Sequence, residues 1–377
     1  MNSFDYIFTG AGCSGLSLLH HLLPSLEDGK TILIIDNTEK NTNDHNWCFW
    51  STTDFGYKSA QKHSWNKACF RTESKIRIDQ LKPYQYYHIA AIDFYDEILQ
   101  KIKQHPSCTI LKADISDLRV QENVCIVSTS EGIFRAKHVF NSIIKLAATD
   151  FPAVSMYQHF FGMKLRIDPK HNIGSDHITL MDFSFSNKDK VQFAYILPFT
   201  STEVLFEYTE FSSKIHSREE YLELLTDYLK SKGIADYQII EEEIGRIPMF
   251  NFRTRVETPN QRIHHIGIAG GLTKPTTGYT FRNIQIDSQK IVKSLKKSDP
   301  FINRFSTNKR FKFYDKLLLG IIESEPQMVK IIMTKLFLKN KMSHILKFLD
   351  EESSISEEIR IFFSIPWKPF LKQLFKD

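Results

Sequence analysis

Residues 5–36, DYIFTGAGCSGLSLLHHLLPSLEDGKTILIID, decide the fold. A short apolar run at 5–9 leads into the glycine turn GAGCSG, then into an apolar segment at 16–23 that Pro24 ends, and then into a second apolar run at 31–36. Two buried strands joined by a glycine turn and one helix predict a right-handed βαβ unit with parallel strands. The chain is therefore expected to begin as an α/β protein with a Rossmann-type domain.

The turn itself matches the pattern GxGxxG. Gly10 permits the tight turn, Gly12 lets a pyrophosphate approach the backbone, and Gly15 lets the helix pack closely on the strand. The N-terminus of the helix then faces the phosphates. Asp36 ends the second strand, where its carboxylate can accept hydrogen bonds from ribose hydroxyls; a surface aspartate after a plain glycine turn is the alternative. The predicted dinucleotide-binding residues are Gly10, Ala11, Gly12, Cys13, Ser14, Gly15 and Asp36.

The uncharged stretch 6–26 could also suggest a membrane helix or a signal peptide. It lacks a basic start and contains the glycine turn, two histidines and Pro24, which a dinucleotide site explains better. We therefore expect no transmembrane span. The 5 cysteines form no CxxC pair, and the 14 histidines show no ligand spacing. This composition predicts a reduced, intracellular protein without disulfides or a metal site.

Downstream, the chain predicts a strand-rich second domain and a helical end. Strands are expected at 178–183, 192–197 and 203–209. Ser217 is expected to cap a helix over 217–230. The expected fold is an α/β two-domain flavoprotein, with a Rossmann-type FAD-binding domain, a mixed-sheet substrate domain and a helical C-terminal region. The expected segments are 1–75, 76–150 and 256–298 for the FAD-binding domain, 151–255 for the substrate domain, and 299–377 for the helical, basic region.

A late glycine loop favours FAD over NAD as the dinucleotide. A buried strand expected at 264–269 leads into GIAGG at 267–271, and PTTGY follows at 275–279. Two-domain flavoproteins carry a dinucleotide-binding fingerprint near the start of the chain and a second glycine loop much later in the sequence. Ile268 stands where many of them carry an aspartate for the ribityl chain, so ribityl anchoring must differ. The residues expected to approach the flavin are Gly270, Gly271, Thr277, Gly278 and Tyr279.

Further short motifs occur in a fixed order along the chain. They are WCFW at 47–50, LMD at 180–182, LFEYT at 205–209, GRIPM at 245–249, PTTGY at 275–279, FLDE at 348–351 and SIPWKPF at 364–370. This ordered set resembles the lycopene cyclases of carotenoid biosynthesis, in their bacterial flavoprotein form, from about residue 4 to 375. Two positions depart from the family pattern: FNSI at 140–143 replaces an Asp-x-Arg or Asp-Gly pattern, and Tyr208 stands where relatives often have an acid.

The resemblance implies a lycopene β-cyclase acting through γ-carotene to β-carotene. A carboxyl group protonates a terminal alkene, the neighbouring double bond closes a ring on the cation, and a ring proton leaves. The acid must stay protonated in an apolar pocket or beside another carboxylate. The resemblance assigns this role to Glu207, and Asp182 is expected to raise its pKa or to hold a proton network. The alternatives are a salt-bridged rim carboxylate for Glu207 and a structural turn for Asp182.

The implied cofactor is FAD in its reduced form, with NAD(P)H as a candidate reductant. One negative charge at about 4 Å, in an effective dielectric near 20, would stabilise the cation by roughly 4 kcal/mol, nearly a thousandfold in rate. Aromatic side chains are expected to line a tunnel for the polyene, although core packing is the alternative for each one. They are Trp47, Phe49, Trp50, Phe160, Phe161, Tyr195, Phe199 and Tyr279.

Charge is unevenly distributed towards the C-terminus. Residues 290–347 contain 14 Lys and Arg against 4 Asp and Glu. This excess predicts peripheral contact with anionic lipids on the cytoplasmic face of the membrane, where other carotenoid-pathway enzymes are candidate partners. A solvated helix face is the alternative, and nucleic acid is not expected because no reading motif is present. The rival functions are a flavin-dependent monooxygenase or a prenyl-chain or carotenoid reductase, and a non-catalytic flavin- or lipid-binding protein.

Overall fold

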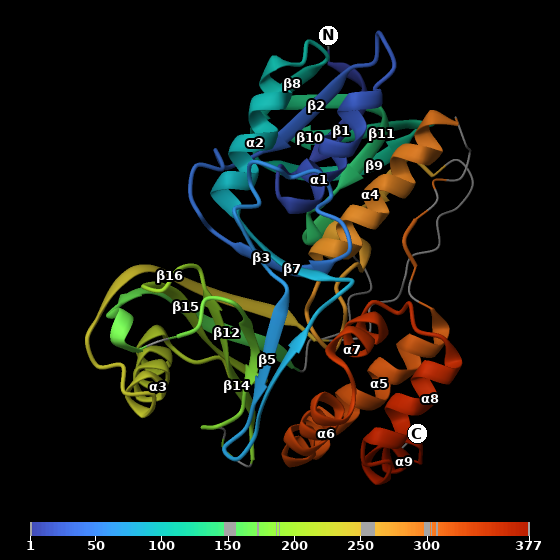
Figure 1. Ribbon diagram of the computed structural model, residues 1–377. Helices are drawn as coiled ribbons and strands as arrows, with labels where there is room; N and C mark the ends of the chain where they lie inside the picture. Colours follow the sequence, from blue (N-terminus) through green and yellow to red (C-terminus); the bar gives the residue numbers. More distant parts are fainter. Residues whose placement is uncertain are drawn as a thin grey trace.

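The computed structural model describes residues 2–375 except 147–155, 172, 186, 188, 250–260, 298–301, 303 and 307. The described strands form three sheets, and the C-terminal helices form a group beside the second sheet (Figure 1). The expected domain boundaries at 150, 255 and 298 lie outside the described residues and stay predictions.

The first sheet contains the predicted βαβ unit. β1 (Ser3–Thr9) pairs in parallel with β2 (Ile32–Asp36), and α1 (Cys13–Leu22) connects them. β1 also pairs in parallel with β11 (Gly132–Asn141). The helix begins earlier than expected because the glycine turn runs directly into its first turn. The remaining strands of this sheet are β8 (Cys108–Lys112), β9 (Ile115–Gln121), β10 (Val124–Thr129) and β17 (Ile263–His265).

Helices cover one face of the first sheet. α1, α2 (Ala91–Gln104) and α4 (Phe281–Lys296) bury Leu19, Phe94 and Ile291 in one apolar cluster with β1 and β2. The turns after β1 and β11 both lie at the carboxyl edge of the sheet, which is where ligands bind in folds of this type.

The second sheet has the strand order β16-β12-β15-β14-β13-β5-β6. Its strands are β5 (Lys67–Arg71), β6 (Ile76–Gln80), β12 (Tyr157–Ile167), β13 (Ile178–Asp182), β14 (Val191–Pro198), β15 (Glu203–Ser212) and β16 (Tyr237–Pro248). The three strands predicted for this region are confirmed. The segments 1–75 and 76–150 need correction, because β5 and β6 join this sheet through the parallel pairing of β5 with β13. Local sequence does not show which sheet a short strand joins.

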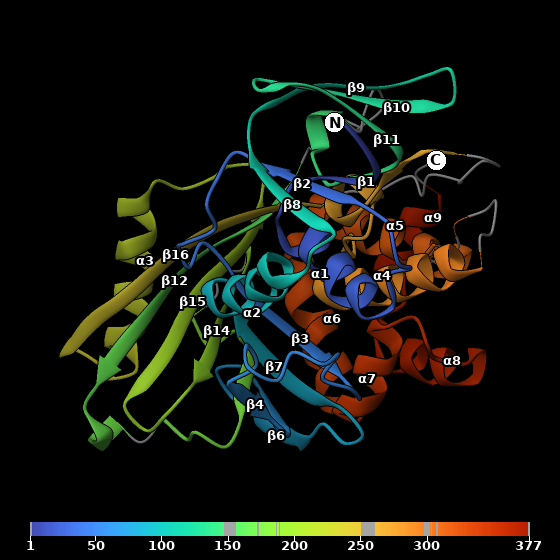
Figure 2. The same cartoon turned by 90° about the horizontal axis from the view of Figure 1, so that it is seen from above.

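The two faces of the second sheet pack against different partners. α3 (Arg218–Ser231) covers one face, where Phe161, Tyr208 and Leu225 share an apolar cluster. Its N-terminus is capped by Ser217 as predicted, in a capping box with Glu220. Viewed from above, α3 and the sheet lie to one side of the molecule and the C-terminal helices to the other (Figure 2).

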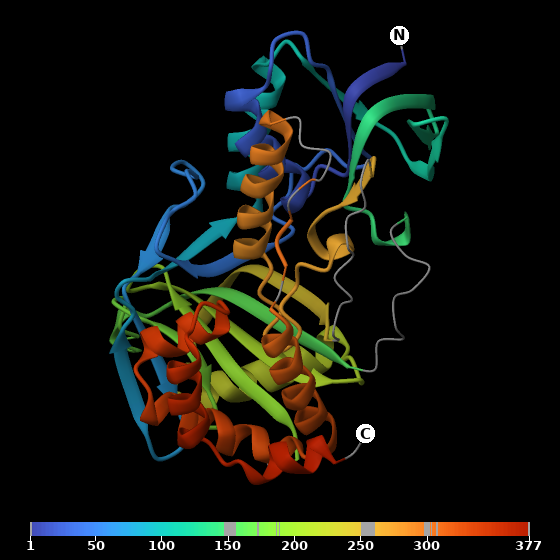
Figure 3. The same cartoon turned by 90° about the vertical axis from the view of Figure 1, so that its right-hand side faces the viewer.

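The C-terminal helices lie against the face of the second sheet that α3 leaves free (Figure 3). They are α5 (Lys309–Ser324), α6 (Pro326–Lys339), α7 (Met342–Leu349), α8 (Ile355–Ser364) and α9 (Lys368–Leu374). Phe337 of α6 stacks on Phe70 of β5, with ring centroids 4.8 Å apart. Within the described part of the chain, every helix is too short or too polar to span a bilayer.

A small third sheet lies between the two larger ones (Figure 1). It consists of β3 (Asn46–Ser51), β7 (Gln85–Ala90) and β4 (His63–Trp65), paired in the order β3-β7-β4. The WCFW motif lies on β3. The motif therefore faces the region where the first and second domains meet.

Candidate active site

A cavity of about 660 Å³ is lined by three separate parts of the fold. Gly12, Ser142 and Thr277 line it from the first domain. Glu207 lines it from the second sheet, and Phe362 lines it from the C-terminal helices. The cavity therefore connects the predicted dinucleotide site with the predicted acid, which are far apart in the sequence.

The first glycine turn has the shape that a dinucleotide requires. Gly10 has φ +107°, and a Cβ there would lie 2.2 Å from Ser142 Oγ. A Cβ at Gly15 would lie 2.3 Å from the carbonyl oxygen of Gly10, whereas a Cβ at Gly12 would have no neighbour within 4 Å. The first and third glycines thus serve close packing, and the second leaves open space on the cavity wall. Of the predicted turn residues, those that line the cavity are Gly12, Cys13 and Ser14.

Asp36 supports the turn through its carboxylate. Its Oδ2 accepts a hydrogen bond of 2.7 Å from the N–H of Ala11, and its Oδ1 accepts two from Thr38. Burial raises the pKa of Asp36, but the Thr38 and Ala11 hydrogen bonds and the charge of Lys40 outweigh it and hold the pKa below its usual value. Asp36 is therefore ionised. It lies outside the cavity lining, so its contact with a ribose stays a prediction.

The late loop approaches the first turn, but through different residues from those expected. The predicted strand at 264–269 is shorter than expected, because a 3-10 turn over Gly267–Gly270 follows β17. Gly267 has φ +61°, and a Cβ there would lie 2.6 Å from Ser14 Oγ. Gly267 and Ile268 line the cavity, whereas Gly270 and Gly271 do not.

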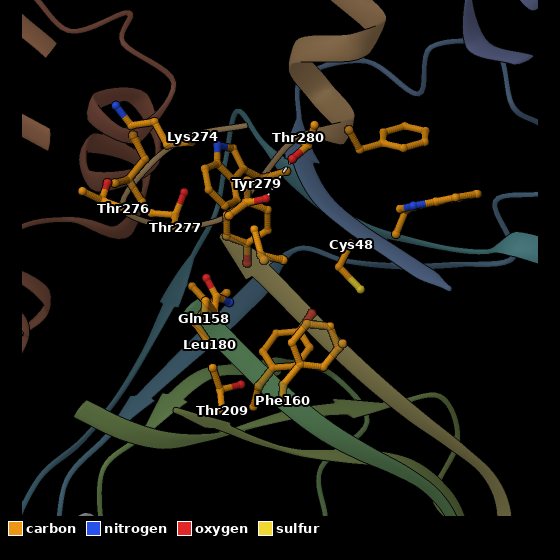
Figure 4. A pocket seen from close by; sticks show the side chains of 18 of the residues that line it. Cys48, Gln158, Phe160, Leu180, Thr209, Lys274, Thr276, Thr277, Tyr279 and Thr280 are labelled. Atoms are coloured by element: carbon orange, nitrogen blue, oxygen red, sulfur yellow. Dashed lines mark hydrogen bonds between the residues drawn. The ribbon is translucent and has the colours of Figure 1, made fainter. Parts of the chain in front are cut away.

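The second motif of the late loop reaches the cavity as predicted, through Thr277, Gly278 and Tyr279. Figure 4 shows Tyr279 and Cys48 facing Phe160 and Thr209, which come from the second sheet. Tyr86 joins two other tyrosines: its hydroxyl lies 2.7 Å from that of Tyr195 and 2.9 Å from that of Tyr279. Three hydroxyls from different elements therefore meet at this wall.

Glu207 carries the perturbed carboxyl group of the cavity. Burial and the nearby negative charge of Glu243 raise its pKa to about 8, while a hydrogen bond of 2.8 Å from Thr209 Oγ1 opposes the shift. A carboxyl group with this pKa is mostly protonated at neutral pH. The side chain predicted to be the acid therefore lies on the cavity wall in the protonated state that the role requires.

Glu243 is the acidic neighbour of Glu207, and the sequence did not indicate it. Glu207 on β15 pairs with Tyr195 on β14 and with Gly162 on β12, and Gly162 pairs in turn with Glu243 on β16. Paired residues point to the same face of a sheet. Glu207 and Glu243 both line the cavity from this row, with only a glycine between them.

Asp182 does not act on Glu207, and the expected partnership between them is wrong. Asp182 pairs with Ala194, which pairs with Tyr208, so its side chain points to the opposite face of the sheet from Glu207. It accepts hydrogen bonds from Tyr228 (2.8 Å) and the N–H of Ser184 (2.8 Å).

The environment of Asp182 explains its structural role. Burial alone would raise the pKa of Asp182, but the Ser184 hydrogen bonds and the ammonium of Lys232, 3.1 Å away, hold it below its usual value. An ionised, fully buried carboxylate that joins a strand to α3 is structural. A structural role was the alternative that the sequence analysis gave for Asp182. The sequence could not decide between the two roles, because a register shift in β13 is not visible in a motif.

The predicted tunnel aromatics divide between the cavity and the core. Those that line the cavity are Trp47, Trp50, Phe160, Tyr195 and Tyr279. Phe49 belongs to the core of the first domain, Phe161 packs under α3, and Phe199 lies at a smaller pocket nearby. The cavity residues that the sequence analysis missed include Tyr86, Phe311, Tyr314, Phe348, Phe362 and Phe370. They come from β7 and the C-terminal helices, whose position over the sheet depends on long-range packing.

Comparison with solved structures identifies the fold. A geranylgeranyl bacteriochlorophyll reductase-like protein from Thermoplasma acidophilum matches with a TM-score of 0.64 and 12% identity, over 99% of each chain. A flavoprotein/dehydrogenase from Cytophaga hutchinsonii matches with a TM-score of 0.63 and 11% identity, over 100% of each chain. The fold is that of a two-domain flavoprotein, as predicted.

Sequence comparison identifies the family. The family model described as lycopene cyclase protein matches residues 5–375. A lycopene beta-cyclase from Pantoea ananas is 23% identical over 74% of this chain and 71% of its own. A lycopene beta-cyclase from Pseudescherichia vulneris is 28% identical over 33% of this chain, and the chain spans about a third, 32%, of that relative. Because the family model covers nearly all the residues that build both domains and the cavity, the chain belongs to the lycopene cyclase family.

Proposed function

We propose that this protein is a lycopene β-cyclase, which converts the linear ends of lycopene through γ-carotene into the β-ionone rings of β-carotene. The reaction is an isomerisation that a proton initiates, without net change in oxidation state. One observation carries the proposal. In a chain of the lycopene cyclase family, Glu207 places a carboxyl group with a pKa raised to about 8 on the wall of a cavity lined mainly by apolar side chains.

Glu207 supplies the proton in this proposal. It is protonated near neutral pH and can give its proton to the terminal alkene of a polyene in the cavity. The tertiary cation that forms is attacked by the neighbouring double bond, which closes a six-membered ring. Loss of an adjacent ring proton leaves the β-ionone ring, so that protons and electrons balance.

The aromatic wall beside Glu207 suits a cationic intermediate. Tyr195 lies in the same cross-strand row as Glu207, and Trp50 meets Tyr279 edge-on with ring centroids 4.4 Å apart. The negative faces of such rings stabilise a nearby cation. The hydroxyl groups of Tyr195 and Tyr279 both contact that of Tyr86, which holds the three rings together at this wall.

FAD is the proposed cofactor, and the residues at the two glycine turns fit it. Gly12, Ser14 and Gly267 would hold the dinucleotide, because the open space at Gly12 and the close approach of Gly267 to Ser14 leave no side chain in its way. Thr277 and Gly278 would adjoin the flavin ring. Reduced FAD, when bound, supplies negative charge that stabilises a cation, and NAD(P)H is the proposed reductant.

We also propose peripheral association with the cytoplasmic face of the membrane that holds the polyene, where other carotenoid-pathway enzymes would be neighbours. The supporting surface lies on α8 and α9 rather than on the basic stretch alone. Every fourth residue from 355 to 375 is an exposed apolar residue, namely Ile355, Ile359, Phe363, Trp367, Leu371 and Phe375. Phe363, Trp367 and Phe375 are 88%, 62% and 85% exposed.

The same two helices connect this surface with the cavity. Phe362, Ile365 and Phe370 line the cavity from α8, α9 and the turn between them. Aromatic residues beside basic ones, here Arg360 and Lys368, are typical of helices that lie in the interface of a bilayer. A polyene could therefore pass from the lipid to the cavity along these helices without crossing water.

Expression in lycopene-accumulating cells, followed by pigment chromatography and mass spectrometry, tests the proposed reaction. We expect cyclic products with the same mass as lycopene, and none from cells that express Glu207→Gln. A product with added hydrogen would indicate a reductase, and a product with added oxygen would indicate a monooxygenase. Either result would contradict the proposal.

A further inference from the structure

A second, smaller pocket lies beside the main cavity. Its volume is about 50 Å³, and its polar lining includes His88, Lys164 and Glu242. Glu243 and Asn46 line both this pocket and the main cavity. Only a few side chains therefore separate the two spaces, and Glu243 is an ionisable one among them.

The small pocket is suited to water. A water molecule needs roughly 10–15 Å³ of such volume and two to four polar partners, and the pocket offers both. The main cavity, in contrast, is lined mainly by aromatic and aliphatic side chains around Glu207. With a hydrocarbon in that cavity, water would reach Glu207 most readily from the side of Glu243.

Gly162 opens the space between the two carboxyl groups. Strands lie about 4.8 Å apart, so the Cα atoms of Glu207 and Glu243, two strands apart, are separated by about 10 Å, which two glutamate side chains can span. A Cβ at Gly162 would lie 3.8 Å from Cβ of Glu207 and 3.2 Å from Leu205 Cδ1. A larger side chain at position 162 would therefore stand between Glu207 and Glu243.

Asn46 holds Glu243 in place from β3. Its N–H donates to Glu243 Oε1 at 3.2 Å and its Nδ2 donates to Oε2 at 2.5 Å. The Asn46 Oδ1 is in turn 2.9 Å from His88 Nε2. Burial raises the pKa of Glu243, and the Asn46 hydrogen bonds partly oppose this. The other ionisable groups around it are His45, Lys164, Glu241, Glu242 and Glu207.

We propose that Glu243 is a proton relay between the small pocket and Glu207, a positioning residue that acts through Glu207 and recharges it for the next ring. The inference rests on the proposed function. After Glu207 has given up its proton, the Glu243 carboxylate takes a proton from water in the pocket. That proton then leaves the Glu243 carboxyl group and binds the Glu207 carboxylate. Only O–H bonds form and break, no electrons are transferred, and the ring proton released during cyclisation balances the one consumed.

Deuterium exchange followed by a single turnover tests the relay. Enzyme that holds oxidised flavin and bound lycopene is mixed with D₂O, and the flavin is reduced after a set delay to start the turnover. Mass spectrometry then measures deuterium in the new ring. We expect wild-type enzyme to transfer deuterium after a short delay. Glu243→Gln should need a delay longer on the order of a hundredfold, because an amide does not relay a carboxyl proton.

Two further variants keep the result interpretable. Glu243→Asp retains a carboxyl group and should restore exchange to within about tenfold of wild type. Glu223→Gln is the matched control, because Glu223 is exposed on α3 and lines neither space, and its exchange should equal wild type. Flavin absorbance shows that each variant is folded.

The outcomes separate the relay from the proposed function. If Glu243→Gln exchanged as fast as wild type and Glu207→Gln was inactive, the relay would be overturned and the cyclase proposal would still stand. Cyclisation by Glu207→Gln would instead overturn the proposed function. Equal slowing by Glu243→Asp and Glu243→Gln would show that Glu243 matters only for the shape of the site, which also overturns the relay.

Discussion

Three influences act on the carboxyl group of Glu207. Burial and the charge of Glu243 favour its neutral form, and the hydroxyl of Thr209 favours its ionised form. Their balance keeps a proton on the residue that we propose as the acid. The geometry of a β-sheet makes this possible, since neighbouring strands place Tyr195, Gly162 and Glu243 in one row with Glu207.

Replacing Glu207 by Gln removes the transferable proton and keeps the size of the side chain. We expect the rate of cyclisation to fall on the order of a hundredfold to ten-thousandfold, while bound flavin changes little. The measurement is the initial rate of β-carotene formation with lycopene in vesicles. The control is Glu223→Gln on the exposed side of α3, and activity retained in Glu207→Gln would contradict the assignment.

Replacing Thr209 by Val removes the hydrogen bond that lowers the pKa of Glu207. Wild-type activity should decline as pH rises through about 8, because the acid form is lost. In Thr209→Val the decline should move to higher pH. The measurement is the pH dependence of the turnover rate, and a decline at unchanged or lower pH would show that another group controls it.

The same carboxyl group should influence stability in one pH range. Its pKa is raised from 4.5 when unfolded to about 8 when folded, so its stabilising effect is present below pH 4.5 and lost as pH rises through about 8. As pH rises between these values, the free energy of unfolding should therefore fall less in Glu207→Gln than in wild type. Urea denaturation at pH 5 and pH 9 would measure the difference, and parallel losses would contradict the raised pKa.

Among the elements, β13 and β15 show how alternation separates chemistry from structure. Glu207 points into the cavity, and the next residue, Tyr208, points to the face that α3 covers. Asp182 shares that second face and joins β13 to α3 through Tyr228 and Lys232. The two acids that the sequence suggested as partners therefore serve different elements.

Replacing Asp182 by Asn should destabilise the second domain without changing the chemistry. Tyr228 and Lys232 would lose an anionic partner that is itself fully buried, which costs about 2–4 kcal/mol. Because the pKa of Asp182 is lowered in the fold, this contribution is fully present above its unfolded pKa of 3.8 and is lost as pH falls from there through the lower folded pKa. Urea denaturation at pH 7 would measure the loss. An altered pH profile of cyclisation with unchanged stability would contradict a structural role.

At the scale of the whole molecule, the C-terminal helices line part of the cavity and also expose the apolar residues of α8 and α9 named above. Both the cavity lining and the exposed apolar surface depend on how these helices pack against the rest of the protein. The basic residues expected to bind lipid are partly engaged within the protein, since Lys330 pairs with Glu73. Apolar insertion is therefore expected to contribute more to membrane binding than the lysines do.

The double variant Phe363→Ser, Trp367→Ser tests this expectation. Binding to vesicles of anionic phospholipid should fall by at least about tenfold, because each buried aromatic side chain contributes roughly 1.5–3 kcal/mol. The quadruple charge reversal of Lys330, Lys335, Lys339 and Lys341 should weaken binding less, and high salt should mask its effect. Sedimentation with vesicles is the measurement.

Ile133→Ser is the matched control for the double variant, because Ile133 is 48% exposed on β11 of the first domain. Its binding should equal wild type. Unchanged binding of the double variant would contradict membrane insertion through α8 and α9. A wild-type dimer that the double variant abolishes would show that a second copy covers this surface instead.

Several features of this protein followed from its sequence alone. The βαβ unit, the strands of the second sheet, the Ser217 cap and the family were predictable, because glycine spacing, apolar alternation and ordered motifs are local properties of the chain. The position of Glu207 on a strand was also predictable, since its motif lies within that strand. Each of these signals depends on residues that are close together in the sequence.

The tertiary structure alone decided which residues meet. Glu243 rather than Asp182 faces Glu207, Gly267 rather than Gly270 reaches the cavity, and β5 and β6 belong to the second sheet. Register shifts, side-chain alternation and long-range strand pairing determine these contacts. A shift of one residue moves a side chain to the opposite face of a sheet, and no local pattern records it.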